Sequence, residues 1–114
     1  MTGPNCIFCK IASGEIPCQK VWESPEGVAF RDLHPQAPTH LLMIPRRHIA
    51  SLAAVQPEDA ELLGRLQAGA AAIAREQGLE SFRLVSNSGA EAGQSVFHLH
   101  YHLLSGRQMA WPPG

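Results

Sequence analysis

The chain has 114 residues, of which 45% are hydrophobic and 17% charged, a globular mixture that excludes wholesale disorder and fits one domain over residues 1–114. Nine Lys and Arg against ten Asp and Glu give a formal net charge of −1, so no DNA or RNA polymer is expected as the main partner. No apolar stretch approaches the roughly 20 residues of a membrane span, and the N-terminus lacks a basic region followed by an apolar one, so a cytoplasmic location is expected.

The first half of the chain predicts one short helix followed by three strands. The helix is expected over residues 6–12, before Ser13-Gly14. Strands over 19–23 and 28–32 form a hairpin, because Ser-Pro-Glu-Gly at 24–27 is a turn sequence. A third strand is expected over residues 41–44.

The clearest element is a helix from about residue 57 to residue 77. Pro57 suits the first helical position, and Gly78 is expected to end the helix in the left-handed conformation. Apolar residues recur at steps of three and four and form one face: Leu63, Leu66, Ala70 and Ile73.

Two further strands, over residues 81–86 and 95–104, complete the pattern. Residues 105–114 end in Trp-Pro-Pro-Gly and form an extended tail. Strands that precede and follow a single long helix indicate an α+β fold with a mainly antiparallel sheet.

The strand predicted over residues 95–104, the histidine segment, carries three alternating histidines. A period of two places one apolar set toward the core (Phe97, Leu99, Tyr101 and Leu103) and His98, His100 and His102 on the other face. Adjacent imidazoles repel when charged, which lowers their pKa values and keeps at least one neutral near pH 7. A neutral imidazole can act as a nucleophile, a general base or a metal ligand.

Residues 87–95, the glycine loop, precede these histidines. Gly89 and Gly93 free the backbone to approach a ligand, and backbone N–H groups near Gly93 could form an anion-binding nest with the Ser95 hydroxyl. Asn87 can add its side-chain amide. Together with the histidines, this loop predicts a phosphate site that faces a nucleophile.

These motifs resemble the histidine triad (HIT) superfamily, in its nucleotide-binding branch. Residues 98–104 read His-Leu-His-Tyr-His-Leu-Leu, which matches that family's pattern of histidines alternating with apolar residues. Further matches cover nearly the whole chain, at residues 6–11, 14–17, 35–40, 44–45, 48–49, 93–95, 106–109 and 111–114.

The resemblance implies a five-stranded antiparallel sheet with one long and one or two short helices, in a homodimer that joins two sheets. It implies hydrolysis of purine nucleoside 5′-phosphoramidates and acyl-adenylates to the nucleoside monophosphate, through a nucleotidyl-histidine intermediate and without an organic cofactor. The tail is expected to reach the partner's active site, with Trp111 near the leaving group.

Site residues follow from the same resemblance. His100 matches the nucleophile, His102 a phosphate-binding residue that also helps to protonate the leaving amine, and His40 a residue that supports proton transfer. The other phosphate-binding positions match Asn87, Gly93, Gln94 and Ser95. The nucleoside pocket matches Ile7, Phe8, Ile11, Phe30, Asp32 and Leu33.

A separate metal site is predicted around Cys6 and Cys9. Three cysteines, an odd number, argue against a disulfide framework, whereas Cys-x-x-Cys spacing suits zinc. The resemblance to bacterial-type members implies that His48 and His98 complete a closed, structural zinc site. A redox role is disfavoured because no strand precedes the motif. The remaining alternative is that the two cysteines have neither a metal-binding nor a redox function.

Other functions are compatible with parts of this pattern. His100 could be a ligand in a metal-dependent hydrolase that uses water as its nucleophile, although the strand carries no acidic residue. The chain could also bind nucleotides without catalysis, or hydrolyse dinucleoside polyphosphates with the same chemistry.

Overall fold

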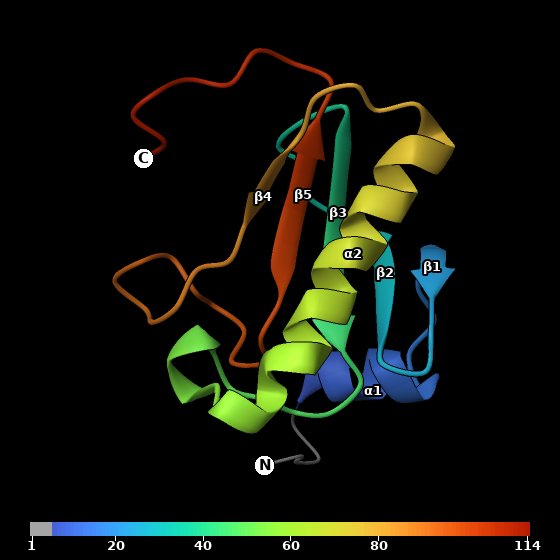
Figure 1. The fold of residues 1–114 in the computed structure, drawn as a ribbon, viewed down its shortest axis with the longest axis vertical. Coiled ribbons are helices and arrows are strands. Elements are labelled where there is room, and N and C mark those ends of the chain that lie inside the picture. Colours follow the sequence, from blue (N-terminus) through green and yellow to red (C-terminus); the bar gives the residue numbers. More distant parts are fainter. Residues whose placement is uncertain (1–5) are drawn as a thin grey trace.

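A computed structural model describes residues 6–114 and has one five-stranded antiparallel sheet, in the order β1-β2-β3-β5-β4 (Figure 1). Helix α2 lies across one face of this sheet, and the short helix α1 packs against the other face near one end. The predicted α+β class is confirmed. The bounds are α1 Ile7–Ser13, β1 Lys20–Glu23, β2 Gly27–Arg31, β3 Thr39–Pro45, α2 Ala60–Gln77, β4 Arg83–Val85 and β5 Tyr101–Ser105.

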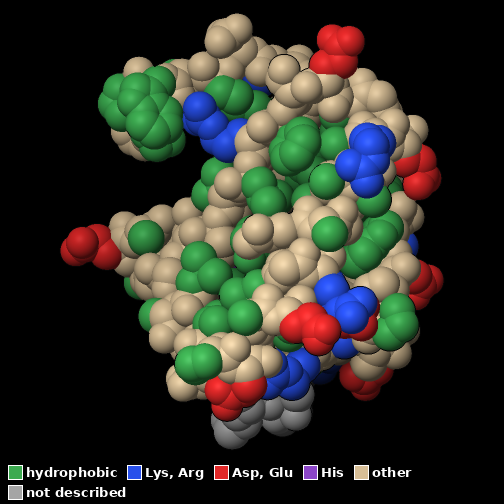
Figure 2. All heavy atoms as spheres, viewed as in Figure 1, with side chains coloured by type: hydrophobic (Ala, Val, Ile, Leu, Met, Phe, Trp, Pro, Cys, Tyr) green, Lys and Arg blue, Asp and Glu red, His purple; other side chains and the backbone are tan. Residues whose placement is uncertain are grey.

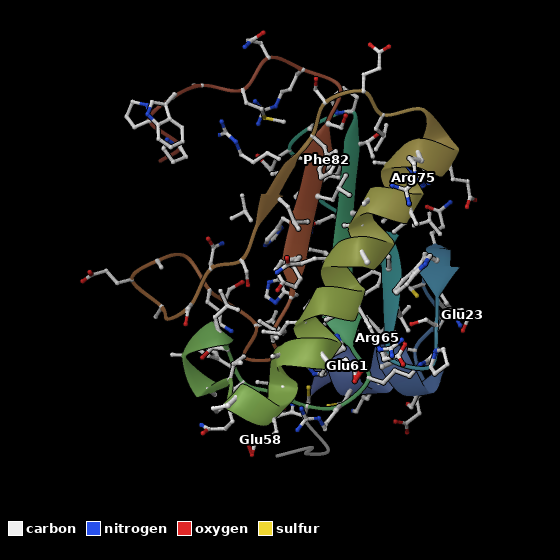
Figure 3. The ribbon with its side chains drawn as sticks, viewed as in Figure 1. Glu23, Glu58, Glu61, Arg65, Arg75 and Phe82 are labelled. Atoms are coloured by element: carbon white, nitrogen blue, oxygen red, sulfur yellow. The ribbon has the colours of Figure 1, made fainter. Side chains whose placement is uncertain are left out.

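The long helix is confirmed with a small change at its start. Residues Pro57–Asp59 form a separate 3-10 turn, from which α2 continues at Ala60. Gly78 ends α2 in the left-handed conformation, with φ of 69°, as predicted. On the exposed side of α2, Glu61 and Arg65 point toward one another at 3.2 Å (Figure 3). Neither helix of the described residues is long and apolar enough to cross a membrane.

Both faces of the sheet are buried, because alternate residues of each strand enter different apolar clusters. The cluster under α2 contains Ala29, Leu41, Met43, Leu66, Ala70, Ile73, Tyr101 and Leu103. The cluster on the α1 face contains Phe8, Ile11, Ala12, Val28, Phe30, Leu42 and Ile44. His40 and His102 share the α1 face, since His40 precedes Leu42 by two residues and His102 pairs with Leu42.

The prediction of a continuous strand over residues 95–104 is wrong in its first half. β5 begins only at Tyr101, and Phe97, predicted to face the core, is 52% exposed. The cause lies at the end of β3, where Pro45 has no N–H to donate and its carbonyl accepts a hydrogen bond from His98 Nε2. The Leu99 N–H donates instead to the Ile49 carbonyl, outside the sheet.

Contact between α2 and β1 depends on a glycine. A Cβ at Gly69 would lie 2.6 Å from Trp22 Cζ2, whereas a Cβ at Gly64 on the same helix meets nothing within 4 Å. We expect Gly69→Ala to destabilise the protein by about 1–3 kcal/mol through overpacking. Gly64→Ala should stabilise it by up to about 1 kcal/mol through helix propensity. Urea unfolding of both variants measures these changes, and equal effects would contradict the close packing of Gly69 on Trp22.

Candidate active site and metal site

The candidate site lies on the α1 face, behind the sheet in the view of Figures 1 and 2. β3 supplies His40, β5 supplies His102, and the segment before β5 supplies His98 and His100. His40, His98 and His100 are buried and His102 is half-buried. The structure therefore brings together all three histidines predicted to take part in catalysis.

One ring nitrogen of His100 is held by the main chain. His100 Nδ1 lies 2.7 Å from the His98 carbonyl oxygen, which can only accept a hydrogen bond. Nδ1 therefore carries the proton, and Nε2 keeps its lone pair. The edge-to-face packing of Phe8, 5.1 Å between ring centroids, fixes the plane of the imidazole. This orientation leaves His100 Nε2 able to act as a nucleophile.

His40 and His102 form a hydrogen-bonded pair, the histidine relay. The Gln36 backbone N–H donates to His40 Nδ1 at 3.0 Å, so neutral His40 carries its proton on Nε2. His40 Nε2 lies 2.9 Å from His102 Nδ1 and donates to it. The proton of neutral His102 is then on Nε2, where it is available to a bound phosphate or a leaving group.

The relay is neutral near pH 7. Burial, followed by the neighbouring His100 and His40, lowers the pKa of His102 to about 4, against an opposing effect of Asp32. Burial also lowers the pKa of His40, with Asp32 again opposing. One Asp32 oxygen lies 3.4 Å from His40 Nε2, and the other accepts the His34 backbone N–H.

The low pKa of His102 makes stability depend on pH. Between pH 6.5 and about 4, a histidine in the unfolded chain takes up a proton that folded His102 does not, so acid favours unfolding. We expect the free energy of unfolding to be lower at pH 5 than at pH 7, and His102→Asn to show a smaller decrease. Urea titrations of both proteins at both pH values test this. The other histidines contribute to the pH dependence of both proteins, so the difference between them reports on His102. Equal decreases would mean that His102 titrates normally.

Cys6, Cys9, His48 and His98 form a second cluster, the cysteine–histidine cluster. The four sulfur–nitrogen distances between the cysteine Sγ atoms and the histidine Nδ1 atoms are 3.3, 3.4, 3.4 and 3.5 Å. Tetrahedral zinc with bonds of about 2.3 Å to sulfur and 2.0–2.1 Å to nitrogen separates such atoms by about 3.5 Å. The donor set and its geometry are thus compatible with zinc.

The surroundings of the cluster favour a metal as well. His98 Nε2 lies 2.8 Å from the Pro45 carbonyl and donates to it, which leaves Nδ1 unprotonated on the side of the cysteines. A carbonyl behind a histidine ligand is the usual outer-shell partner in metal sites. Cys6 also caps α1, since its sulfur accepts the Cys9 backbone N–H at 3.3 Å.

Asp32, His40 and His102 also place their donor atoms within 4.8 Å of one another. Their hydrogen bonds differ from those of the cysteine–histidine cluster. Because Gln36 donates to His40 Nδ1, His40 Nε2 carries a proton and has no lone pair for a metal. This pattern favours a proton relay over a metal-bound water at this position.

The glycine loop is linked to the histidine segment by the bond from Gln94 Nε2 to the Val96 carbonyl, and its predicted phosphate ligands differ in environment. A Cβ at Gly93, where φ is 100°, would lie 3.6 Å from Asn87 Nδ2, so Asn87 and Gly93 adjoin. Ser95 is exposed and lines a shallow pocket with Cys6, Ile7 and Phe97. Gln94 is buried, and its side chain bonds to backbone groups of the protein.

The residues predicted to bind the nucleoside divide into a buried and an exposed set. Phe8, Ile11 and Phe30 are buried together, and the Phe8 and Phe30 rings lie 5.8 Å apart. Ile7 and Leu33 are 47% and 90% exposed and lie outside this buried set.

Sequence reasoning missed two groups that contact the histidines. One is the backbone N–H of Gln36, and the other is Ser86, whose hydroxyl donates to the His100 carbonyl at 2.8 Å. A main-chain donor carries no side-chain signal. Ser86 was predicted only as the end of a strand, and its contact depends on the pairing of β4 with β5.

The chain is similar to several known proteins. A family model described as "Scavenger mRNA decapping enzyme C-term binding" matches residues 5–111. An uncharacterized HIT-like protein of Synechocystis is 50% identical over 111 residues, covering 96% of this chain and 97% of its own. A "14 kDa zinc-binding protein" of Zea mays is 48% identical over 95% of this chain and 87% of its own. The crystal structure of a HIT family hydrolase from Legionella pneumophila has a TM-score of 0.94, with 53% identity over 96% of this chain and all of the other.

Proposed function

The chain belongs to the histidine triad superfamily, and we propose that it hydrolyses purine nucleoside 5′-phosphoramidates and acyl-adenylates to the nucleoside monophosphate. The observation that carries the proposal is the hydrogen bond of His100 Nδ1 to the His98 carbonyl, 2.7 Å long. This bond leaves Nε2 of His100 as an oriented nucleophile on the same face as the His102 Nε2–H. The proposed phosphate ligands are Asn87, Gly93, Ser95 and His102.

The proposed reaction has two steps. His100 Nε2 attacks the phosphorus, a bond forms between them, and the phosphorus–nitrogen bond to the leaving amine breaks. The amine leaves with the proton from His102 Nε2. Water then attacks the nucleotidyl-histidine, its proton returns to His102 Nε2, and the bond from phosphorus to His100 breaks. The His98 carbonyl stabilises the positive charge on the substituted imidazole in between.

The buried aromatic and aliphatic side chains beside His100 suit a purine base. Phe8, Ile11 and Phe30 form an apolar wall on the α1 face, and Ile7 and Leu33 would cover the base from the rim. Asp32 could accept both ribose hydroxyls, because a carboxylate offers two oxygens.

We further propose that the cysteine–histidine cluster holds a structural zinc ion. The ion would be bound by Cys6, Cys9, His48 and His98, and it would fix the start of α1, and with it Ile7 and Phe8, against the sheet. A relative of this chain is described as a zinc-binding protein, which supports the proposal. Four protein ligands leave no open position, so the ion would take no part in the reaction.

The function is tested by incubating the protein with adenosine 5′-phosphoramidate and measuring the release of AMP, with and without a chelator. Turnover that survives chelation would support a histidine nucleophile. Turnover lost on chelation, in a protein that stays folded by circular dichroism, would favour the metal-dependent hydrolase. Folded protein without any turnover would reject the phosphoramidase.

We also propose that two copies pair through the free edge of β4. The opposite edge, β1, has a register shift between Lys20 and Trp22 and carries an ion pair of Lys20 with Glu23, features that block edge pairing. β4 instead begins next to Phe82, which is 41% exposed (Figure 3). The C-terminal tail stands away from the body over a notch beside this edge (Figure 2), and its Trp111 is 83% exposed.

A charge at the edge of β4 should therefore separate the two copies. We expect Phe82→Glu to convert a dimer into a monomer, because a carboxylate would be desolvated at the interface. Lys20→Glu, a charge change at the opposite edge, should leave the dimer intact. Light scattering after size-exclusion chromatography gives the masses, and a wild-type monomer would refute the pairing.

A further inference from the structure

The side chain of Gln94 is fully engaged inside the protein. Gln94 is 4% exposed, and its Nε2 donates to the carbonyls of Ala50 at 2.8 Å and Val96 at 3.0 Å. Its Oε1 accepts the Gly89 N–H at 2.8 Å, and its backbone N–H donates to the Gly89 carbonyl. Every hydrogen that Gln94 could offer to a phosphate is already donated.

We propose that Gln94 is a positioning residue that holds the glycine loop in its phosphate-binding shape, and that it is not itself a phosphate ligand. This inference rests on the proposed function, because it concerns the same phosphate site. It changes the role predicted for Gln94 from the sequence.

Two of the three bonds of the Gln94 side chain are local in sequence, to Gly89 and Val96, and the third reaches the distant Ala50. Gly89 lies near the start of the glycine loop and Val96 directly follows its end, so the amide connects the two ends of the loop. Ala50 belongs to the segment after β3, whose Ile49 carbonyl also accepts the Leu99 N–H. One side chain thus fixes the glycine loop to the segment that leads from His48 and to the entry of the histidine segment.

The loop needs such a brace because of its glycines. Gly89 and Gly93 have φ of 96° and 100°, and glycine loses more conformational freedom on ordering than any other residue. Without the brace, Asn87 and Ser95 would sample positions away from the developing charge on phosphorus. Pre-organised donors are effective because they need no rearrangement during the reaction.

Only a glutamine satisfies this position. The site requires one acceptor and two donors on a chain of this length. Glutamate would lose both donors, asparagine is one methylene shorter, and methionine has a similar shape without these hydrogen bonds. Gln94→Met therefore removes the brace with little change in volume.

The variant is tested by activity, ligand affinity and amide hydrogen exchange. We expect Gln94→Met to lower kcat/KM for adenosine 5′-phosphoramidate by about 100-fold, as small misplacements in active sites do. Its affinity for AMP should fall while its affinity for adenosine is retained, and the Gly89 amide should exchange faster without ligand. Gln77→Met, at the exposed end of α2, is the matched control and should match the wild type in every measurement.

A direct phosphate contact would give a different result. AMP affinity would then fall in Gln94→Met while the exchange of Gly89 in the free protein stayed as in the wild type, and that outcome overturns the inference. An unchanged kcat/KM also overturns it.

Two measurements keep the inference testable if the first assay fails. If Gln94→Met does not fold, the wild type decides, since a Gly89 amide protected before AMP is added supports the brace and one protected only afterwards refutes it. If the wild type shows no turnover, the phosphoramidase proposal fails, whereas AMP affinity and Gly89 exchange still test the role of Gln94.

Discussion

Replacing His100 by alanine is expected to lower the turnover of adenosine 5′-phosphoramidate by about 10⁴-fold or more, the scale on which enzymes lose activity without their nucleophile. The imidazole is buried, its Nδ1–H is bound to the His98 carbonyl, and its Nε2 is free to attack. No other described histidine has its main-chain acceptor at Nδ1 and an unprotonated Nε2, so no neighbour can replace it. The rates of AMP release by the wild type and by His100→Ala give the ratio of their turnover numbers.

Two controls separate a lost nucleophile from a damaged site. His34→Ala removes an exposed imidazole outside the cluster and should keep wild-type turnover. Rapid quenching followed by intact-mass measurement should detect a nucleotidyl adduct on the wild type and none on His100→Ala. An adduct on the variant, or turnover close to that of the wild type, would assign the nucleophile to another residue.

Replacing Cys9 by alanine is expected to abolish zinc binding and to lower Tm by more than about 10 °C. A ligand present at 100 times its Kd stabilises the folded state by about 2.7 kcal/mol. In a domain of this size, each kcal/mol corresponds to about 4–8 °C. The effect on stability is large because the cluster connects α1 to His48, which follows β3, and to His98, which precedes β5.

Cys18→Ala is the matched control, because Cys18 packs beside the apolar cluster on the α1 face and lies outside the four-residue set. Colorimetric titration of released zinc and calorimetry should show one zinc ion per chain in wild type and in Cys18→Ala. Zinc retained by Cys9→Ala at full stoichiometry would disprove the proposed ligand set.

Much of the fold could be predicted because each element carries a local signal. The apolar repeat from Leu63 to Ile73 and the glycine at 78 define α2, and the turn at 24–27 defines the first hairpin. The start of β5 could not be predicted in this way. The alternation around His98 is that of a strand, but the path there is decided by Pro45 and Ile49, which are distant in sequence.

The candidate site also has features that could be predicted from the sequence and features that could not. The resemblance to the histidine triad family grouped His40 with His100 and His102, and it added His48 and His98 to the Cys6 and Cys9 pair. It could not reveal which nitrogen of each imidazole carries the proton, since that depends on hydrogen bonds formed in three dimensions. Gln94 shows the same limit, because a polar residue in a glycine loop reads as a ligand until its partners are known.

The hydrogen bonds that fix the tautomers have an evolutionary consequence. His100 is oriented by a carbonyl, and the relay by the Gln36 N–H, and both groups belong to the main chain. Every amino acid supplies the carbonyl, and proline alone lacks the N–H. The exposed position 36 can therefore accept almost any amino acid except proline, and the proton stays on the same nitrogen of His40. The tautomers of His40 and His100 depend on the course of the backbone, so substitutions of neighbouring side chains leave them unchanged as long as the fold is kept.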